Sequence, residues 1–208
     1  KNSIKIATPV SHLFENAKFS SQIINLSDCL ECRDHSIDKD LKSQELFHCD
    51  LQPIHKFSKK DIDTLIRIKS KKLDLKLISF HLASCYKKPK VKKGIFYPNG
   101  VKTSIEELKY NAQVNLSRIK EIFGKNISIS VENNNYYKTE AYDYITDPDF
   151  ISSIVYDNDI NFLFDISHAK ISASNSGVDF DEYLSKLPLN RVNQIHISKE
   201  DINSKGEV

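Results

Sequence analysis

Short apolar runs in this sequence are each followed at once by a His, Glu or Asp residue, and this repeated pattern constrains the fold most. The residues that follow the runs are His55, His81, Glu132, Asp165 and His196. In a barrel of parallel strands all strands point the same way, so the residues at their carboxyl ends converge on one mouth. The pattern therefore favours a barrel in which these side chains share a site.

Helix-like segments separate the predicted strands. The strands are Ile4–Thr8, Cys29–Arg33, Leu51–His55, Leu75–Leu82, Ile127–Glu132, Asn161–Asp165 and Val192–Ser198. Ser58 and Asp61 form a capping-box pattern at one helix start, and Asp147-Pro148 opens another. Alternation of strands and helices indicates a parallel α/β fold. The few glycines form no GxGxxG loop, which favours a barrel over a doubly wound sheet.

Length and charge suit one soluble domain. A net charge of +2 gives no general reason to expect nucleic acid or an acidic membrane as partner. No apolar run approaches the roughly 20 residues of a membrane span. The segment from Lys1 to Thr8 is too short and too polar for a signal peptide. We therefore expect a single barrel domain over residues 1–208, in the cytoplasm, without nucleic-acid or membrane partners.

The residues that follow the apolar runs are metal-ligand types. His168 lies three residues after Asp165 and adds a further imidazole. Histidine with carboxylates suits zinc, manganese or iron and does not suit a thiolate cluster. So many ligands exceed one tetrahedral site, which indicates two or more ions. The alternative is a set of hydrogen-bonded polar residues in a mouth that binds no metal.

A lysine-rich stretch, Ser84–Lys102, follows the strand that ends near His81. It is predicted to be irregular, and it contains Lys87, Lys88, Lys90, Lys92 and Lys93. Its charge fits a solvated surface loop. Its position after a barrel strand also fits a cationic lid or docking loop on the active-site face.

In this order, His81, Glu132, Asp165-x-x-His168 and His196 resemble the xylose isomerase-like barrel superfamily. Within it, the sequence is most similar to the multinuclear non-heme iron-dependent oxidative enzymes, of which the methanobactin-biosynthesis oxidase is the best-known type. The resembling stretches include Phe80-His81-Leu82-Ala83, Val131-Glu132-Asn133-Asn134 and Gln194-Ile195-His196-Ile197-Ser198. The similarity is strong from about residue 127 to residue 198 and weak before residue 55.

The resemblance implies a site and a chemistry. Its metal ligands would be His55, His81, Glu132, Asp165, His168 and His196, around two or three iron ions, with zinc or manganese as alternative metals. Glu132, Asp165 and His196 would be the catalytic residues. The implied reaction is oxidative remodelling of a cysteine-containing ribosomal precursor peptide. The implied partners are that peptide and a small protein that delivers it.

The sequence departs from the superfamily near its end. The superfamily has an Asp-x-His pair in the loop after the strand of His196 and a Glu on the final strand, and neither occurs before Val208. Barrels of this type usually have about 250 residues. We therefore expect an α/β, xylose isomerase-like (β/α)8 barrel that lacks its C-terminal strand in this chain.

Other functions fit parts of the pattern. A divalent-metal sugar or sugar-phosphate isomerase or epimerase would use Glu132 as ligand or base, with lysines for the phosphate. A zinc phosphodiesterase of the endonuclease IV type shares the Asp165-x-x-His168 spacing, but the near-neutral charge argues against it. A barrel remnant that acts as a binding module is the non-enzymatic interpretation.

Some polar residues receive a structural interpretation instead. Glu31 ends a strand with Arg33 beside it, so a structural ion pair is at least as good an interpretation as a metal ligand. His48 is interpreted as a surface residue or as a support behind the ligands. Asn175 and Lys199 are further candidates for substrate contact.

Overall fold

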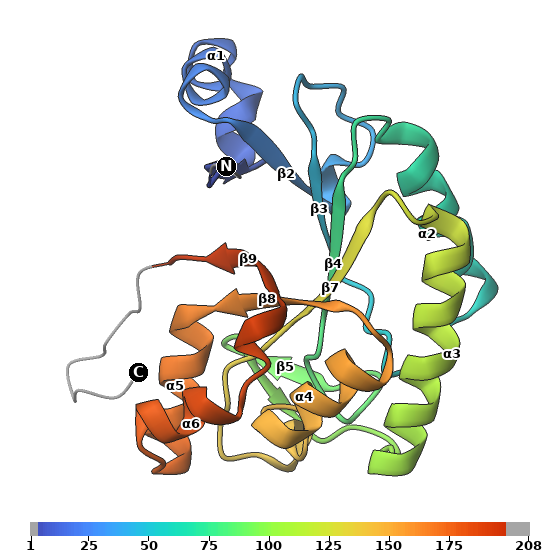
Figure 1. Cartoon of the computed structure of the whole chain (residues 1–208), viewed down its shortest axis with the longest axis vertical. Coiled ribbons are helices and arrows are strands. Elements are labelled where there is room, and N and C mark those ends of the chain that lie inside the picture. Colours follow the sequence, from blue (N-terminus) through green and yellow to red (C-terminus); the bar gives the residue numbers. More distant parts are fainter. Residues whose placement is uncertain (1–3, 199–208) are drawn as a thin grey trace.

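The computed structural model describes residues 4–198, in which seven strands form one parallel sheet. The strands, in sheet order, are β1 (Ala7–Pro9), β2 (Cys29–Arg33), β3 (Leu46–Cys49), β4 (Leu77–His81), β7 (Ser128–Glu132), β8 (Asn161–Asp165) and β9 (Val192–His196). The sheet curls into part of a barrel (Figure 1). Within the described residues β1 and β9 are its two edges. The predicted α/β barrel that lacks a strand is confirmed.

Helices connect the strands and lie on the outer side of the sheet (Figure 1). They are α1 (Ala17–Leu26), α2 (Lys59–Lys71), α3 (Ile105–Phe123), α4 (Pro148–Asp157), α5 (Ile166–Ser176) and α6 (Phe180–Lys186). The predicted capping box is present, because Ser58 accepts from the N–H of Asp61 and Asp61 accepts from the N–H of Ser58. Asp147 caps α4 just before Pro148, as predicted.

One predicted strand is wrong. The third strand of the sheet is Leu46–Cys49, whereas Leu51–His55 forms turns. Pro53 lies inside the predicted strand and has no N–H to donate to a ladder. Phe47 is fully buried and anchors the observed strand between β2 and β4. As a result His48, and not His55, lies on a barrel strand.

The lysine-rich stretch is more regular than predicted. It contains an antiparallel hairpin of β5 (Lys90–Lys92) and β6 (Ile95–Tyr97). Lys93 and Gly94 form its two-residue turn with φ angles of 49° and 78°. Positive φ at both positions is typical of the type I′ turn that suits a tight hairpin. The hairpin belongs to the connection between β4 and α3, so it lies on the carboxyl side of the sheet.

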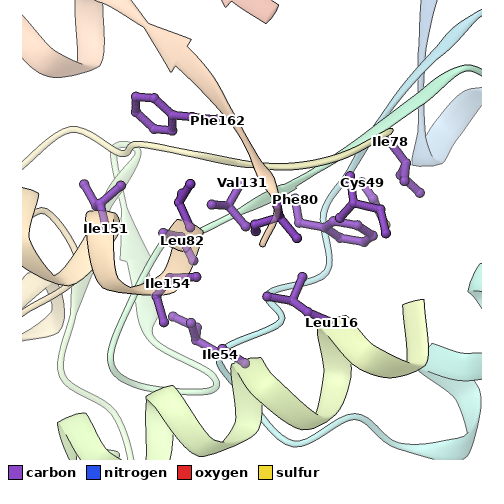
Figure 2. Close-up of a cluster of buried hydrophobic side chains, with 14 of the residues drawn as sticks. Cys49, Ile54, Ile78, Phe80, Leu82, Leu116, Val131, Ile151, Ile154 and Phe162 are labelled. Carbon is purple, nitrogen blue, oxygen red and sulfur yellow. The ribbon is translucent and has the colours of Figure 1, made fainter. Parts of the chain in front are cut away.

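The hydrophobic core lies between the outer face of the sheet and the helices. Alternate strand residues point to opposite faces, and Phe80 of β4 and Val131 of β7 point toward the helices. There they approach Leu116 of α3 and Ile154 of α4 (Figure 2). All four are almost completely buried. The same alternation turns residues such as Glu132 to the inner face, where the site lies.

No helix among residues 4–198 is long and apolar enough to cross a membrane. The expected cytoplasmic location stays a prediction.

Candidate metal centre

Glu132 lies at the centre of a cluster of imidazoles on the inner face of the sheet. Its Oε2 lies 3.0 Å from Nδ1 of His81 and 3.2 Å from Nε2 of His48. Its Oε1 lies 3.0 Å from Nδ1 of His196 and 3.9 Å from Nδ1 of His168. The side chain of Glu132 is only 3% exposed. Each oxygen of this carboxylate therefore faces a different pair of histidines.

Two more carboxylates join the cluster. Oδ2 of Asp165 lies 3.8 Å from Nδ1 of His168 and 4.0 Å from Nδ1 of His196. Oε2 of Glu31 lies 2.8 Å from Nε2 of His196. Asp165 also caps α5, because its Oδ1 accepts from the N–H of His168 at 2.9 Å. The Asp-x-x-His spacing thus has a local cause: the carboxylate begins the helix that carries the histidine.

Strand register brings these residues to neighbouring levels of the barrel. His81 is level with Glu132 on the adjacent strand, and Asp165 is level with His196. His48 is level with Ser79, two residues before His81. Because side chains two residues apart point to the same face, His48 and His81 both face inward. Their rings pack edge to face, with centroids 4.2 Å apart.

Two groups of three ligand atoms lie close enough to hold an ion each. One group is His48, His81 and Glu132, and the other is Glu132, Asp165 and His196. Within each group the ligand atoms lie within 4.8 Å of one another. Glu132 belongs to both groups. A carboxylate shared in this way can bridge two ions.

Burial and hydrogen bonding set the charge states inside the cluster. Burial raises the pKa of Glu132, but hydrogen bonds with His196, His48 and His81 outweigh it and hold that pKa well below its usual range. Burial lowers the pKa of His196, but the hydrogen bonds to Glu132 and Glu31 outweigh it and raise the pKa to about 10. Burial lowers the pKa of His48, which favours its neutral form. The carboxylates therefore hold a positive charge at His196 when no cation is bound.

These donors fit a metal centre. Neutral imidazoles and ionised carboxylates suit iron, zinc or manganese, and neither group contains a thiolate. The Nδ1 of His48 hydrogen-bonds Ser79 at 2.8 Å, which fixes the ring with Nε2 toward Glu132. The buried Oε1 of Gln194 has no hydrogen-bond partner among the described residues. Gln194 donates through Nε2 to Glu31, whose Oε2 also contacts His196, so this free acceptor lies beside the cluster.

Five of the six predicted ligands come together: His81, Glu132, Asp165, His168 and His196. The sixth, His55, does not join them. Its Nε2 lies 2.8 Å from the carbonyl oxygen of Ser84, and it belongs to neither ligand group. His55 was predicted at the end of a strand, but it lies in turns after β3, and for this reason it does not reach the cluster.

His48 and Glu31 were not among the six predicted ligands, yet both contact the cluster. Both lie on strands, and the run Leu46–Cys49 is itself an apolar strand with a histidine inside it. Glu31 does form the expected ion pair with Arg33, at 3.0 Å, but it also contacts His196. Asn175 donates to the carbonyl of Tyr136, and Lys199 lies outside the described residues.

The sequence model of one family matches residues 53–205 of this chain. That family is described as the RiPP precursor modification enzyme MbnB/TglH/ChrH. The chain belongs to this family. The resemblance inferred from the ordered histidines and carboxylates is thereby confirmed. The match to the MbnB/TglH/ChrH family begins after Glu31 and His48, which the structure adds to the cluster.

Curated relatives of this MbnB/TglH/ChrH family member match over short stretches. A UPF0276 protein of Acaryochloris marina is 30% identical over 83 residues, which are 40% of this chain and 29% of that protein. A UPF0276 protein of Caulobacter vibrioides is 37% identical over 68 residues, which are 33% of this chain and 24% of that protein. The matched stretches therefore span about a quarter of the length of these relatives.

Solved structures with a similar fold include sugar epimerases. The apo 3-keto-D-glucoside 4-epimerase YcjR of E. coli has a TM-score of 0.66 and 15% identity, over 95% of this chain and 80% of that chain. A D-allulose 3-epimerase from Methylomonas sp. has a TM-score of 0.58 and 12% identity, over 94% of this chain and 74% of that chain. At such low identity the likeness shows the fold alone. It shows that this MbnB/TglH/ChrH family member shares the α/β barrel fold of these enzymes.

Proposed function

We propose that this chain carries the metal site of an oxidative enzyme that modifies a cysteine-containing ribosomal precursor peptide. One observation carries the proposal: Glu132 is shared between two adjacent ligand groups. Two ions bridged by one carboxylate suit a multinuclear centre better than a single-metal isomerase site. The description of the matching family, a RiPP precursor modification enzyme, supports the substrate class.

The proposed metal is iron, as two or three ions. One ion would lie with His48, His81 and Glu132, and a second would share Glu132 with Asp165 and His196. Bound iron would supply one-electron chemistry with dioxygen. A soft thiolate from the substrate cysteine can join a centre that has open positions.

The chain's own residues prepare this centre. Glu132 stays ionised because hydrogen bonds with three histidines outweigh its burial, and His48 stays neutral because it is buried. Asp165 fixes the start of α5 and thereby the position of His168. His196 must lose a proton before it can bind a cation, and its contact with Glu31 orients the ring. A small partner protein that delivers the peptide is part of the same proposal.

Metal content of protein purified without oxygen tests the centre. We expect two or more irons per chain in the wild type and loss of metal in Glu132→Gln, which keeps the size of the side chain and removes its charge. Glu45→Gln is the matched control, because Glu45 lies just before β3 and its carboxylate pairs with Lys5 and Lys76 instead of with the cluster. Its metal content should equal that of the wild type.

Other outcomes would contradict the proposal in different ways. A single loosely held manganese or magnesium would favour a sugar isomerase or epimerase instead. Three zinc ions would favour a phosphodiesterase. Metal that is unaffected by Glu132→Gln would mean that the cluster is not the site. With iron present, incubation with dioxygen and cysteine-containing precursor peptides, read by mass spectrometry, tests the reaction itself.

A further inference from the structure

The β5–β6 hairpin has one covered edge and one open edge. In a two-residue hairpin, Lys92 and Ile95 next to the turn exchange hydrogen bonds, so the next pair, Val91 and Phe96, points its backbone groups outward. On the β6 side both outward backbone groups of Phe96 have hydrogen-bond partners. Its N–H donates to the hydroxyl of Tyr142 at 3.0 Å, and its carbonyl accepts from the hydroxyl of Thr139 at 2.7 Å.

On the β5 side Val91 has no such partner. Neither its N–H nor its carbonyl makes an outward hydrogen bond to any of residues 4–198. Its side chain is 58% exposed. The open edge of β5 therefore offers a donor and an acceptor to an incoming strand.

The chain segment that carries this edge is rich in lysine. Five exposed lysines lie on or beside it: Lys87, Lys88, Lys90, Lys92 and Lys93. The sequence contains no acidic residue between Ser84 and Lys102. Among the described residues, no carboxylate forms an ion pair with any of the five. Their charge is thus available to a partner that carries negative charge.

The hairpin is also firmly attached. Phe96 stacks on Tyr142, with ring centroids 5.7 Å apart, and Tyr142 is 1% exposed. At the base of the stretch Tyr86 bridges to Lys102, and Lys102 forms an ion pair with Asp143 at 2.5 Å. The hairpin is therefore already ordered before a partner binds to β5. Little binding free energy would be lost in ordering it.

We infer that the β5 edge docks an extended, acidic segment of the peptide substrate by strand addition. Backbone groups of Val91 would pair with the segment, and the flanking lysines would select acidic side chains. The hairpin follows β4, whose last residue is His81, so a segment held there lies on the carboxyl side of the sheet, as the cluster does. The substrate class rests on the proposed function, but the binding surface does not depend on metal.

The probe is a short fluorescein-labelled peptide in which glutamate alternates with threonine, and anisotropy measures its binding. Val91→Pro removes the outward N–H at an edge position where proline is tolerated. We expect about fivefold weaker binding, the effect of one hydrogen bond. Lys90→Glu with Lys92→Glu should weaken binding about tenfold, and added salt should weaken wild-type binding.

Two controls separate this surface from general charge. Lys71→Glu with Lys125→Glu makes the same charge change at exposed positions near the opposite ends of the strands and should leave binding unchanged. A probe with lysine in place of glutamate should not bind. Slower amide exchange at Val91 in the complex, measured by NMR, would support strand pairing.

The outcomes are distinct. If Val91→Pro binds the probe as the wild type does and Val91 gains no protection, the strand-addition inference is overturned. If Lys71→Glu with Lys125→Glu weakens binding equally, the lysines of β5 act only as solvated charge and the inference is likewise overturned. Iron content serves as the separate readout of the proposed function, because Val91→Pro leaves the cluster untouched.

Discussion

Nε2 of His48 lies 3.2 Å from Oε2 of Glu132, and their side chains are 1% and 3% exposed. His48 and His55 are both buried and lie seven positions apart in sequence, yet only His48 faces the cluster. This contrast gives a matched pair of variants. We expect His48→Gln to lose at least one bound iron and His55→Gln to keep all of them, by elemental analysis. Equal loss in both variants would contradict the assignment of His48.

The contact between Glu31 and His196 gives a second prediction. Glu31 is held ionised, since burial raises its pKa but the hydrogen bond with His196 outweighs that effect. Glu31→Gln should lower metal affinity about tenfold, because a carboxylate behind a ligating imidazole orients it and strengthens it. Competition with a chelator measures this affinity. Glu45→Gln serves as the control, and an unchanged affinity in Glu31→Gln would show that the contact does not tune the ligand.

Lys72 gives a prediction about stability. Its buried ammonium donates to the carbonyls of Ser36 and Lys39 and to Oε1 of Gln44, at 2.9, 2.7 and 2.5 Å. Lys72→Met would leave the Lys39 carbonyl without this donor, whereas the Ser36 carbonyl keeps the N–H of Lys39 and Gln44 keeps Cys32, so we expect the free energy of unfolding to fall by about 2 kcal/mol. Lys71→Met, at the exposed neighbouring position, should change it by less than about 0.5 kcal/mol. Urea unfolding measures both.

His55 gives a prediction about pH. Burial lowers its pKa, although the hydrogen bond to the Ser84 carbonyl opposes this. The unfolded chain therefore binds the proton more readily than the folded chain. The contribution of His55 to stability is complete above about pH 6.5 and is lost as the pH falls through the folded pKa. Wild type should lose more unfolding free energy than His55→Gln on acidification, and parallel pH profiles would contradict this.

The fold was predictable because the signals were local and repeated. The strands at Cys29–Arg33 and Asn161–Asp165 have the predicted bounds, and Ser58 and Asp147 cap helices as expected. The strand at Leu46–Cys49 was missed because it follows a long charged stretch, while buried Ile54 gave the segment after it a similar apolar character.

The site was predictable only in part. His81, Glu132 and Asp165 each end a strand, so periodicity alone reveals them. Glu31 and His48 reach the cluster through the curvature of the sheet, which no local pattern encodes. The hairpin was not predicted, although Lys93-Gly94 is a turn sequence between Val91 and Ile95. The five lysines favoured the interpretation as a solvated loop.

The hydrogen bond between Glu31 and His196 joins residues 165 positions apart. Contacts of such long range require most of the chain to be arranged first, so they form late and slow the search for the native state. The contact between Glu31 and His196 therefore forms only after β2 and β9, five positions apart in the sheet order, have taken their places. A ligand that binds only the folded form stabilises that form by mass action. Bound metal would therefore stabilise the contacts that form last. More complete refolding with iron present follows from this geometry.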